Sequence, residues 1–308
     1  MRAISIGECM VELRQIEGDR YVRAFAGDAY NAAVYLKRSA PHVHVAFLTA
    51  TGEDPLSRTM RDAFAAEGIA DVDAFIAKGR EPGLYMIELD AAGERCFHYW
   101  RSASAARCWC ALLAQNGGAE RLASVDLLCL SGISLAILPD DEARAAAIDL
   151  LVSLKNRVRW IAFDANVRPA LWRDLDAARA AIAPMIRIAD IFRASCEDVA
   201  LLTEAHEPKT QISALRAAGA REIALTLGGE GCIVATEEGE VALPAPAVKI
   251  KDTSGAGDAF TGAYLAGRLG GAAAAEAAHA ALMVASRVVT YPGAIVPAKV
   301  SHPEDIGC

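Results

Sequence analysis

Towards the C-terminal end of the chain, a glycine-rich turn is followed at once by an acidic residue. In the segment 251–267, Gly255, Ala256 and Gly257 directly precede Asp258. Small residues let backbone N–H groups crowd around an anion, and the helical pattern that follows adds the positive end of a helix dipole. Phosphoryl transfer to a hydroxyl needs such a site beside a carboxylate, which takes the proton while the dipoles hold the transferring charge. The same residues could also serve only a tight turn and a helix cap.

An alternating segment over 83–101 gathers further polar side chains. Residues two apart in a strand share a face, so Tyr99 and Arg101 project to one side, with Tyr85 on the partner strand. An arginine grips a carboxylate with two parallel hydrogen bonds. The set therefore suits a small polyhydroxy acid, although Arg101 could also be a solvated charge that protects a sheet edge.

Arg168 supplies a second positive charge. It follows the apolar run 160–164, at the carboxyl edge where α/β sheets bind their ligands. Taken alone, it could also be an ordinary residue of a surface loop.

These residues need a sheet and helices to position them. Apolar runs typical of strands occur at 43–49, 127–132, 160–166, 190–195 and 222–228. Helical patterns occur at 54–68, 139–156, 175–187, 196–204, 209–218, 257–269 and 272–289. This alternation predicts βαβ crossovers, and hence an α/β fold with a mainly parallel central sheet that is buried on both faces.

Residues 9–26 and 83–101 interrupt that alternation. Both have period-two patterns with one polar face, and residues 90–93 offer a hairpin turn. We therefore expect a small β-sheet lid outside the main sheet. No flexible linker is evident, so we predict a single domain over residues 1–308 into which the lid is inserted.

Composition and charge exclude several classes of protein. The 308 residues include 31 Lys and Arg against 39 Asp and Glu, for a net charge of −8, which disfavours nucleic acid as a partner. An apolar share of 54% with 6% aromatics is typical of a helix-rich globular protein. Glu8 and Glu12 interrupt the N-terminal apolar region, and no run is long enough to span a membrane, so we expect a cytoplasmic protein without membrane contact.

Eight cysteines are scattered without a C-x-x-C pair. Cys108 and Cys110 flank Trp109, and an alternating pattern would place both thiols on one face, where reduced cysteine acts as a small apolar residue. A redox or metal-binding pair is the less favoured interpretation. Reduced thiols fit the cytosol.

The P-loop, Rossmann and protein-kinase motifs are absent from the sequence. The segment D-T-S-G-A-G-D instead resembles the D-T-x-G-A-G-D signature of the ribokinase-like (PfkB) carbohydrate kinases. The resemblance implies that Asp258 is the catalytic base, that Gly255, Ala256 and Gly257 hold the γ-phosphate, and that Asp252 supports the turn. It also implies ATP and Mg²⁺ as cofactors, and a three-layer αβα sandwich with a β-sheet lid.

The resemblance extends over most of the chain. Residues 26–38 are similar to the first family signature, with matching Gly27 and Asn31 but Ala26 in place of a glycine. Residues 225–232 resemble the strand and turn that pack against the nucleotide, and the residues expected to bind it are Asn166, Thr226, Gly228, Gly229, Gly231, Gly255, Gly257 and His279. His279 stands where the family has an asparagine, and could equally be a packing residue.

Segments 6–13, 83–101, 130–138 and 163–172 are similar to family members that act on keto-deoxy sugar acids. This implies ATP-dependent phosphorylation of 2-keto-3-deoxy-D-gluconate at its 6-hydroxyl. The residues expected to bind this sugar acid are Gly27, Asn31, Tyr85, Tyr99, Arg101, Arg168 and Asp258. Another sugar of the same kinase class, such as fructose, and a non-catalytic sugar- or nucleotide-binding regulator are the alternatives.

One departure concerns the metal. Many family members have N-x-x-E after the strand equivalent to 190–194, whereas this chain has Ser195, Cys196, Glu197 and Asp198. Asp198 is the expected organiser of the magnesium shell, with Glu197 as the substitute, while phosphates and water supply most ligands. A homo-oligomer formed through the lid is also expected from the resemblance.

Overall fold

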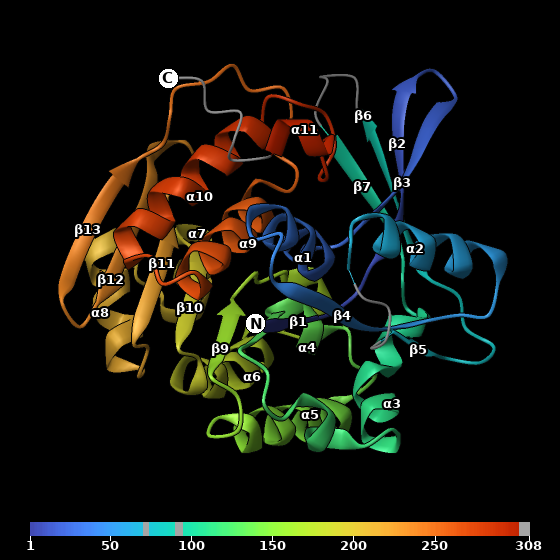
Figure 1. The fold of residues 1–308 in the computed structure, drawn as a ribbon, viewed down its shortest axis with the longest axis horizontal. Coiled ribbons are helices and arrows are strands. Elements are labelled where there is room, and N and C mark those ends of the chain that lie inside the picture. The colour runs from blue at the N-terminus through green and yellow to red at the C-terminus, as the bar shows by residue number, and fades with distance from the viewer. Residues whose placement is uncertain (70–73, 90–94, 302–308) are drawn as a thin grey trace.

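The computed structural model describes residues 1–308 except 70–73, 90–94 and 302–308 (Figure 1). Its main sheet has nine strands in the order β13-β12-β11-β10-β9-β8-β1-β4-β5. Their bounds are β1 (Arg2–Ile6), β4 (His44–Thr51), β5 (Ala74–Ile76), β8 (Leu127–Ser131), β9 (Trp160–Asp164), β10 (Ile191–Ser195), β11 (Glu222–Thr226), β12 (Gly231–Thr236) and β13 (Gly239–Pro244). The strands from β5 to β11 are parallel, and β12 and β13 add an antiparallel hairpin at one edge.

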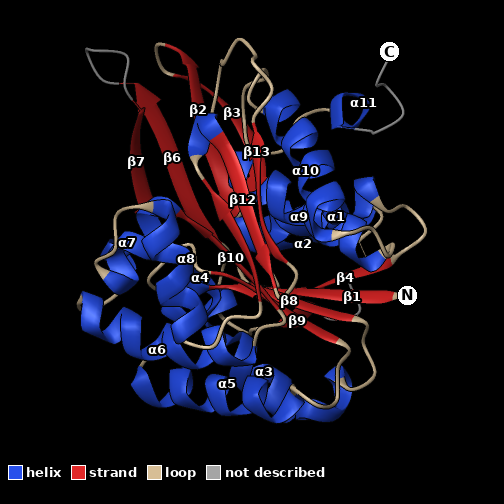
Figure 2. Cartoon of the chain, turned by 90° about the vertical axis from the view of Figure 1, so that its left-hand side faces the viewer, coloured by secondary structure: helices blue, strands red, loops and turns tan. Residues whose placement is uncertain are grey.

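Helices cover both faces of this sheet (Figure 2). One face carries α3 (Trp109–Gln115), α4 (Gly132–Ala136), α5 (Asp141–Leu154), α6 (Leu175–Ile188), α7 (Cys196–Thr203) and α8 (Pro208–Ala217). The other carries α1 (Asp28–Ser39), α2 (Pro55–Ala66), α9 (Ala256–Leu269) and α10 (Ala274–Val288), with the short α11 (Ala298–Ser301) beyond them. Each face has its own apolar core. The predicted three-layer α/β sandwich is confirmed.

A second, four-stranded sheet forms the predicted lid. Its order is β3 (Arg20–Ala26), β2 (Met10–Glu17), β6 (Gly83–Leu89) and β7 (Arg95–Trp100). Strands β2 and β6 are parallel, whereas β2–β3 and β6–β7 are antiparallel. The inner face packs Met10, Ala26, Tyr85 and Ile87 against Ala294 of the main body. The predicted turn at 90–93 lies outside the described residues.

Helices α1 and α9 lie side by side, and α9 also packs against α10 (Figure 1). Gly262 permits this approach, because a Cβ atom there would lie 2.4 Å from the carbonyl oxygen of Ala32. The close contact brings the N-terminal ends of α1 and α9 together, although they come from opposite ends of the sequence.

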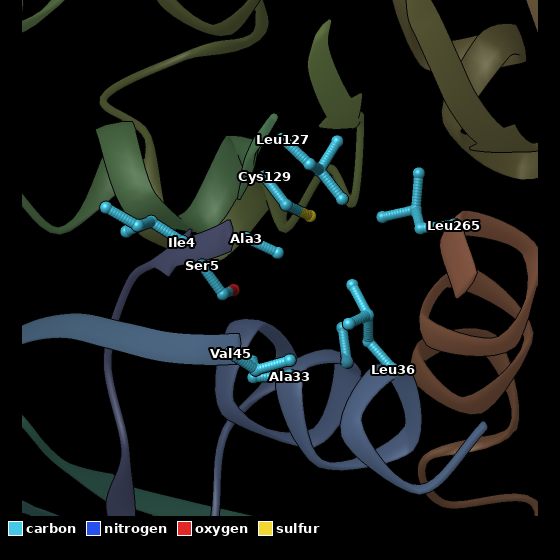
Figure 3. Close-up of a pocket in the computed structure, with 10 residues that line it drawn as sticks. Ala3, Ile4, Ser5, Ala33, Leu36, Val45, Leu127, Cys129 and Leu265 are labelled. Carbon is cyan, nitrogen blue, oxygen red and sulfur yellow. The ribbon is translucent and has the colours of Figure 1, made fainter. Parts of the chain in front are cut away.

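Where α1, α9 and the sheet meet, a small cavity of about 10 Å³ remains (Figure 3). Leu36 of α1, Leu265 of α9 and Cys129 of β8 line it together with other mostly apolar side chains. Such a volume is about that of a single water probe, far below the few hundred Å³ of a ligand site. This cavity is a packing gap in the core.

The expectation for Cys108 and Cys110 was wrong in its local structure. Residues Ala105–Cys108 form a 3₁₀ turn and α3 begins at Trp109, so the two thiols do not share the face of a strand. Trp109 is fully buried and donates its Nε1–H to the carbonyl oxygen of Ser134 at 2.9 Å. This buried indole anchors the helix that the sequence pattern missed. Every cysteine in the described part of the chain is a free thiol.

Within the described ranges, no helix combines the length and apolar character needed to cross a bilayer.

Candidate active site

The turn before α9 has the conformation that its glycine dictates. Gly255 is the N-cap of α9 and has a φ of 73°, in the left-handed region that favours glycine. A Cβ atom at this position would also lie 2.4 Å from the carbonyl oxygen of Ala294. The turn therefore leads directly into the first N–H groups of a long helix, which are free of helix-internal partners and carry positive potential.

Asp258 lies in the first turn of α9 and is joined to the start of α1. Asn31 donates its Nδ2–H to Asp258 Oδ2 at 2.8 Å, and its Oδ1 accepts from the N–H of Gly27 at 3.3 Å. Gly27 packs tightly against the segment between β1 and β2, because a Cβ there would lie 2.1 Å from the carbonyl oxygen of Glu8. The structure thus brings Gly27, Asn31 and Asp258 into one site.

The pKa of Asp258 is raised to about 7, and burial is the largest cause. The carboxylate of Asp28 raises this pKa further, and the hydrogen bond from Asn31 lowers it. A carboxyl group that titrates near neutrality can accept a proton from a substrate and remain partly ionised at the working pH.

Asp28 links three elements beside Asp258. Its Oδ2 accepts a hydrogen bond from Asn166 Nδ2 at 2.8 Å and another from Ser131 Oγ. Asn166 is buried, has a φ of 30° and follows β9. Asn166 therefore points to the start of α1, and it is not among the residues that line the large cavity described next.

A cavity of about 420 Å³ is lined in part by Ala256 and Gly257 of the glycine turn. Its volume falls within the range typical of ligand sites. Among the residues expected to bind a nucleotide, Thr226, Gly228, Gly229, Gly231 and Gly257 line it. The remaining wall is mostly apolar and includes Pro246, Val248, Ile250, Phe260, Leu282 and Val289. An apolar pocket that leads to an anion-binding turn suits a heterocyclic base joined to phosphates.

His279 is exposed on α10 and does not line this cavity. The residues of α10 that do so are Leu282, Ala285 and Ser286. His279 therefore lies before the part of the helix that faces the pocket.

On the lid, Tyr85 and Tyr99 occupy directly opposite positions of β6 and β7. Their rings are stacked with centroids 5.7 Å apart, and the guanidinium carbon of Arg101 lies 6.0 Å from the ring centroid of Tyr99. Burial raises the pKa of Tyr99, while the charges of Arg101 and Arg168 oppose that rise. The charges of both arginines thus affect the pKa of the same hydroxyl group. Tyr99 and Arg168 are also exposed enough to contact a ligand.

Arg101 forms an ion pair with a buried carboxylate. Its guanidinium pairs with Glu8, which also accepts a hydrogen bond from Ser104 Oγ. Burial raises the pKa of Glu8 and the charge of Arg101 opposes the rise. A second buried acid, Glu12, accepts the hydroxyl hydrogen of Tyr85. These acids fix the two lid side chains in place.

Asp198 has a structural set of partners. It accepts from the N–H of Val167 at 2.7 Å, and from the N–H and Oγ of Ser195 at 3.0 and 2.9 Å. The carboxylate therefore caps α7 and ties it to the loop after β9. Glu197, and not Asp198, lines the large cavity. Among the described residues, no group of three His, Cys, Asp or Glu side chains is placed to hold a metal ion.

Asp252 links the glycine turn to the segment that follows α10. Its Oδ1 accepts from the N–H of Ser254 and its Oδ2 from the N–H of Gly293, both at 2.8 Å. The turn is thereby fastened to the segment that follows α10.

Arg193 and Asp164 are not among the site residues predicted from the sequence, and Asp28, Glu8 and Glu12 have no predicted role in the site. A signal for Arg193 and Asp164 is nonetheless present, because each is the only charged residue within a strand of the buried parallel sheet. Charged groups at such positions are rarely buried unless they are paired or functional.

The chain matches the family model described as "pfkB family carbohydrate kinase" over residues 2–300. It is 36% identical to 2-dehydro-3-deoxygluconokinase of Dickeya dadantii (strain 3937), over 95% of this chain and 96% of the relative. It is 37% identical to the enzyme of that name from Escherichia coli (strain K12), with the same coverage of both chains.

Solved structures show the same fold. Aminoimidazole riboside kinase from Salmonella enterica, complexed with aminoimidazole riboside and an ATP analogue, superposes with a TM-score of 0.81 at 23% identity, covering 99% of this chain and 97% of the other. Fructokinase from Vibrio cholerae O395 in a form with fructose, ADP and calcium ion bound has a TM-score of 0.81 at 24% identity, covering 95% and 94%.

Proposed function

The chain belongs to the pfkB family of carbohydrate kinases, and on this basis we propose that it transfers the γ-phosphoryl group of ATP to 2-keto-3-deoxy-D-gluconate. The product would be 2-keto-3-deoxy-6-phosphogluconate. The two relatives named 2-dehydro-3-deoxygluconokinase support the substrate. The observation that carries the proposal is the position of Asp258, which is held by Asn31 in the first turn of α9 and directly follows Gly257 in the wall of a nucleotide-sized cavity.

In this proposal Asp258 is the general base. The 6-hydroxyl oxygen forms a bond to the γ-phosphorus, the bond from that phosphorus to the leaving oxygen of ADP breaks, and the hydroxyl proton goes to Asp258. Asn31 orients the carboxylate through its hydrogen bond to Oδ2. The N–H groups of Gly255, Ala256 and Gly257 stabilise the charge on the transferring group.

The acid end of the sugar lies under the lid. Arg101 and Arg168 bind the carboxylate and 2-keto group, and Tyr85 and Tyr99 flank the carbon chain. The joint effect of both arginines on the Tyr99 hydroxyl supports this placement. Gly27 and Asn31 border the hydroxyl end, next to Asp258. A neutral sugar such as fructose would bind without dependence on the two arginines. This difference distinguishes the proposed sugar acid from the main alternative, a neutral sugar.

ATP occupies the large cavity, with Thr226, Gly228, Gly229 and Gly231 beside it. The exposed His279 does not line this cavity, and the proposal gives it no contact with ATP. When bound, Mg²⁺ would neutralise phosphate charge, with most of its ligands supplied by phosphates and water. Glu197 lines the cavity and would organise that shell, since the Asp198 carboxylate is engaged by Ser195 and by the N–H of Val167.

We further propose one kinase domain with an inserted lid, in a cytoplasmic homo-oligomer formed through the outer face of the lid. That face presents Leu84, Met86 and the 57% exposed Trp100 next to a broad hollow. A second copy of this chain would cover these apolar side chains.

The test is a coupled assay of ADP release across a panel of keto-deoxy sugar acids, neutral hexoses and ribose. The expected result is turnover with 2-keto-3-deoxygluconate at a kcat/KM at least about tenfold above any neutral sugar, since charged hydrogen bonds contribute about 1.5–3 kcal/mol each. Preference for a neutral sugar would contradict the proposed substrate. ATP binding without turnover on any sugar would indicate that the protein is a non-catalytic regulator.

A further inference from the structure

The proposed reaction leaves Arg193 without a role, although its guanidinium lies close to Gly257 of the glycine turn. Arg193 lies in β10, between β9 and β11, and its side chain is only 11% exposed. Its Nη1 donates to both carboxylate oxygens of Asp164, at 3.0 and 3.2 Å, and its Nη2 donates to Thr226 Oγ1 at 3.0 Å. Burying a guanidinium in the middle of a parallel sheet is costly, so its position calls for an explanation.

The guanidinium of Arg193 lies against the anion-binding turn. A Cβ atom on Gly257 would be 2.8 Å from Nη2 and 3.4 Å from the guanidinium carbon. Glycine at this position therefore lets the cation approach the backbone at the start of α9. Its Nε is buried and has no hydrogen-bond partner among the described residues.

Arg193 also faces the nucleotide cavity. Among the described residues that line the cavity, it is the only Lys, Arg or His. The other charged groups that interact with it are the carboxylates of Asp164, Asp198 and Asp258. Without Arg193, the only charged side chain among the described lining residues would be the carboxylate of Glu197.

The orientation of Arg193 is fixed from two elements. Thr261 of α9 donates to Asp164 Oδ2 at 2.9 Å, and Asp164 in turn holds Nη1. Strand β9, strand β10 and helix α9 are thus joined through one carboxylate. This arrangement leaves the Nη1 and Nη2 edge of the guanidinium nearest to Gly257.

We propose that Arg193 binds the β- and γ-phosphates of the nucleotide and that Asp164 and Thr226 position it for that contact. The inference rests on the proposed use of ATP and goes beyond it by assigning the phosphate-binding cation. Arg193 would lower the repulsion between the phosphates and the surrounding carboxylates, and would stabilise negative charge on the group in flight.

The test is a binding series measured by calorimetry without sugar, with magnesium present, for ATP, ADP, AMP and adenosine. For Arg193→Met we expect the affinity for ATP and ADP to fall about 10- to 100-fold, the range for loss of a charged hydrogen bond. Adenosine, which lacks phosphates, should bind within about twofold of the unaltered protein, because the base pocket is untouched. Arg193→Lys should give intermediate values for ATP, since an ammonium keeps the charge but not the fork of donors.

Removing Arg193 leaves Asp164 as an unpaired buried charge, which could impair folding. The double variant Arg193→Met/Asp164→Asn removes both charges and keeps an acceptor for Thr261, so it gives a folded reference. Arg268→Met is the matched control. Arg268 lies on α9, is partly buried, pairs with Glu222 of β11 and does not line the cavity.

Unchanged ATP affinity in the double variant would show that Arg193 serves only to neutralise Asp164, and equal weakening of ATP and adenosine would point to collapse of the pocket. Either result overturns the inference. Failure of the sugar proposal is separate: ATP would still bind in an Arg193-dependent way while 2-keto-3-deoxygluconate is not phosphorylated. If the unaltered protein binds no ATP, both proposals fall.

Discussion

Asn31 and Asp258 are joined by a hydrogen bond of 2.8 Å across 227 positions of sequence. Each lies in the first turns of its helix, and the two helices pack directly against each other. The side-chain amide of Asn31 thereby fixes the carboxylate of Asp258, which directly follows the glycine turn. The pairing turns two separate sequence segments into one site.

Replacing Asp258 by Asn keeps the shape of the side chain and removes the proton acceptor. We expect kcat to fall about 10²- to 10⁴-fold, the usual contribution of a general base, with little change in the Kd for ATP. Steady-state kinetics and calorimetry measure these two quantities. Asp149→Asn, on an exposed position of α5, is the control and should leave both unchanged. Near-normal kcat in Asp258→Asn would remove Asp258 from the role of base.

The pH dependence should follow the raised pKa of Asp258. Because the base must be ionised, kcat/KM should fall as the pH drops below about 7. Asp28→Asn removes a negative neighbour that raises this pKa, and Asn can still accept from Asn166 and Ser131. We therefore expect the acid limb of the pH–rate profile to move to lower pH in Asp28→Asn. A limb that stays in place, or moves to higher pH, would contradict the electrostatic coupling.

Truncating Arg101 should weaken binding of the sugar acid. Arg101→Ala is expected to raise the KM for the acid about 10- to 100-fold, with little effect on the KM for ATP. Arg168→Ala should act in the same direction. Arg23→Ala is the matched control, because Arg23 is an exposed arginine on lid strand β3 that lies over Phe25. An unaltered KM for the acid in Arg101→Ala would refute the assigned clamp.

Gly255→Ala should damage both stability and activity. The φ of 73° alone costs a non-glycine residue about 1–3 kcal/mol, and the added methyl group would strike the carbonyl oxygen of Ala294. We expect a lower free energy of unfolding in urea titrations and loss of ATP binding. Gly229→Ala is the control in the same cavity, since a Cβ there meets no atom within 4 Å. Equal stability of the two variants would argue against a strained turn.

The outer face of the lid should govern assembly. Trp100→Glu places a charge on the apolar surface formed with Leu84 and Met86, and we expect it to shift an oligomer towards monomer. Light scattering after size-exclusion chromatography reports the mass. His98→Glu, on the same strand face and exposed, tests whether any added charge has this effect. A monomeric unaltered protein would disprove assembly through the lid.

Much of the fold could be predicted from local patterns. The parallel strands alternate with helices whose starts are marked by caps, as at Asp54, which accepts from the N–H of Ser57. The lid strands could be predicted from period-two alternation. The helix at Trp109 could not, because its apolar residues are too closely spaced to separate a short helix from a strand. The hairpin of β12 and β13 was missed for a related reason, since β13 is largely exposed and lacks an apolar run.

The site was less accessible to sequence reasoning. The glycine turn and Asp258 are contiguous, so their chemistry is visible in one segment. The buried acids Glu8 and Glu12 gave no such signal, because their partners Arg101 and Tyr85 lie on a different part of the chain. Such pairings depend on the packing of the lid, which local patterns do not specify.

The segment around Ala294 connects helix α1 to the glycine turn. Tyr35 of α1 donates its hydroxyl hydrogen to the carbonyl oxygen of Ala294, the same oxygen that lies behind Gly255. The Tyr35 oxygen also accepts from the N–H of Val296. A nascent chain therefore lacks the backing of its glycine turn until residues 294–296 have been added.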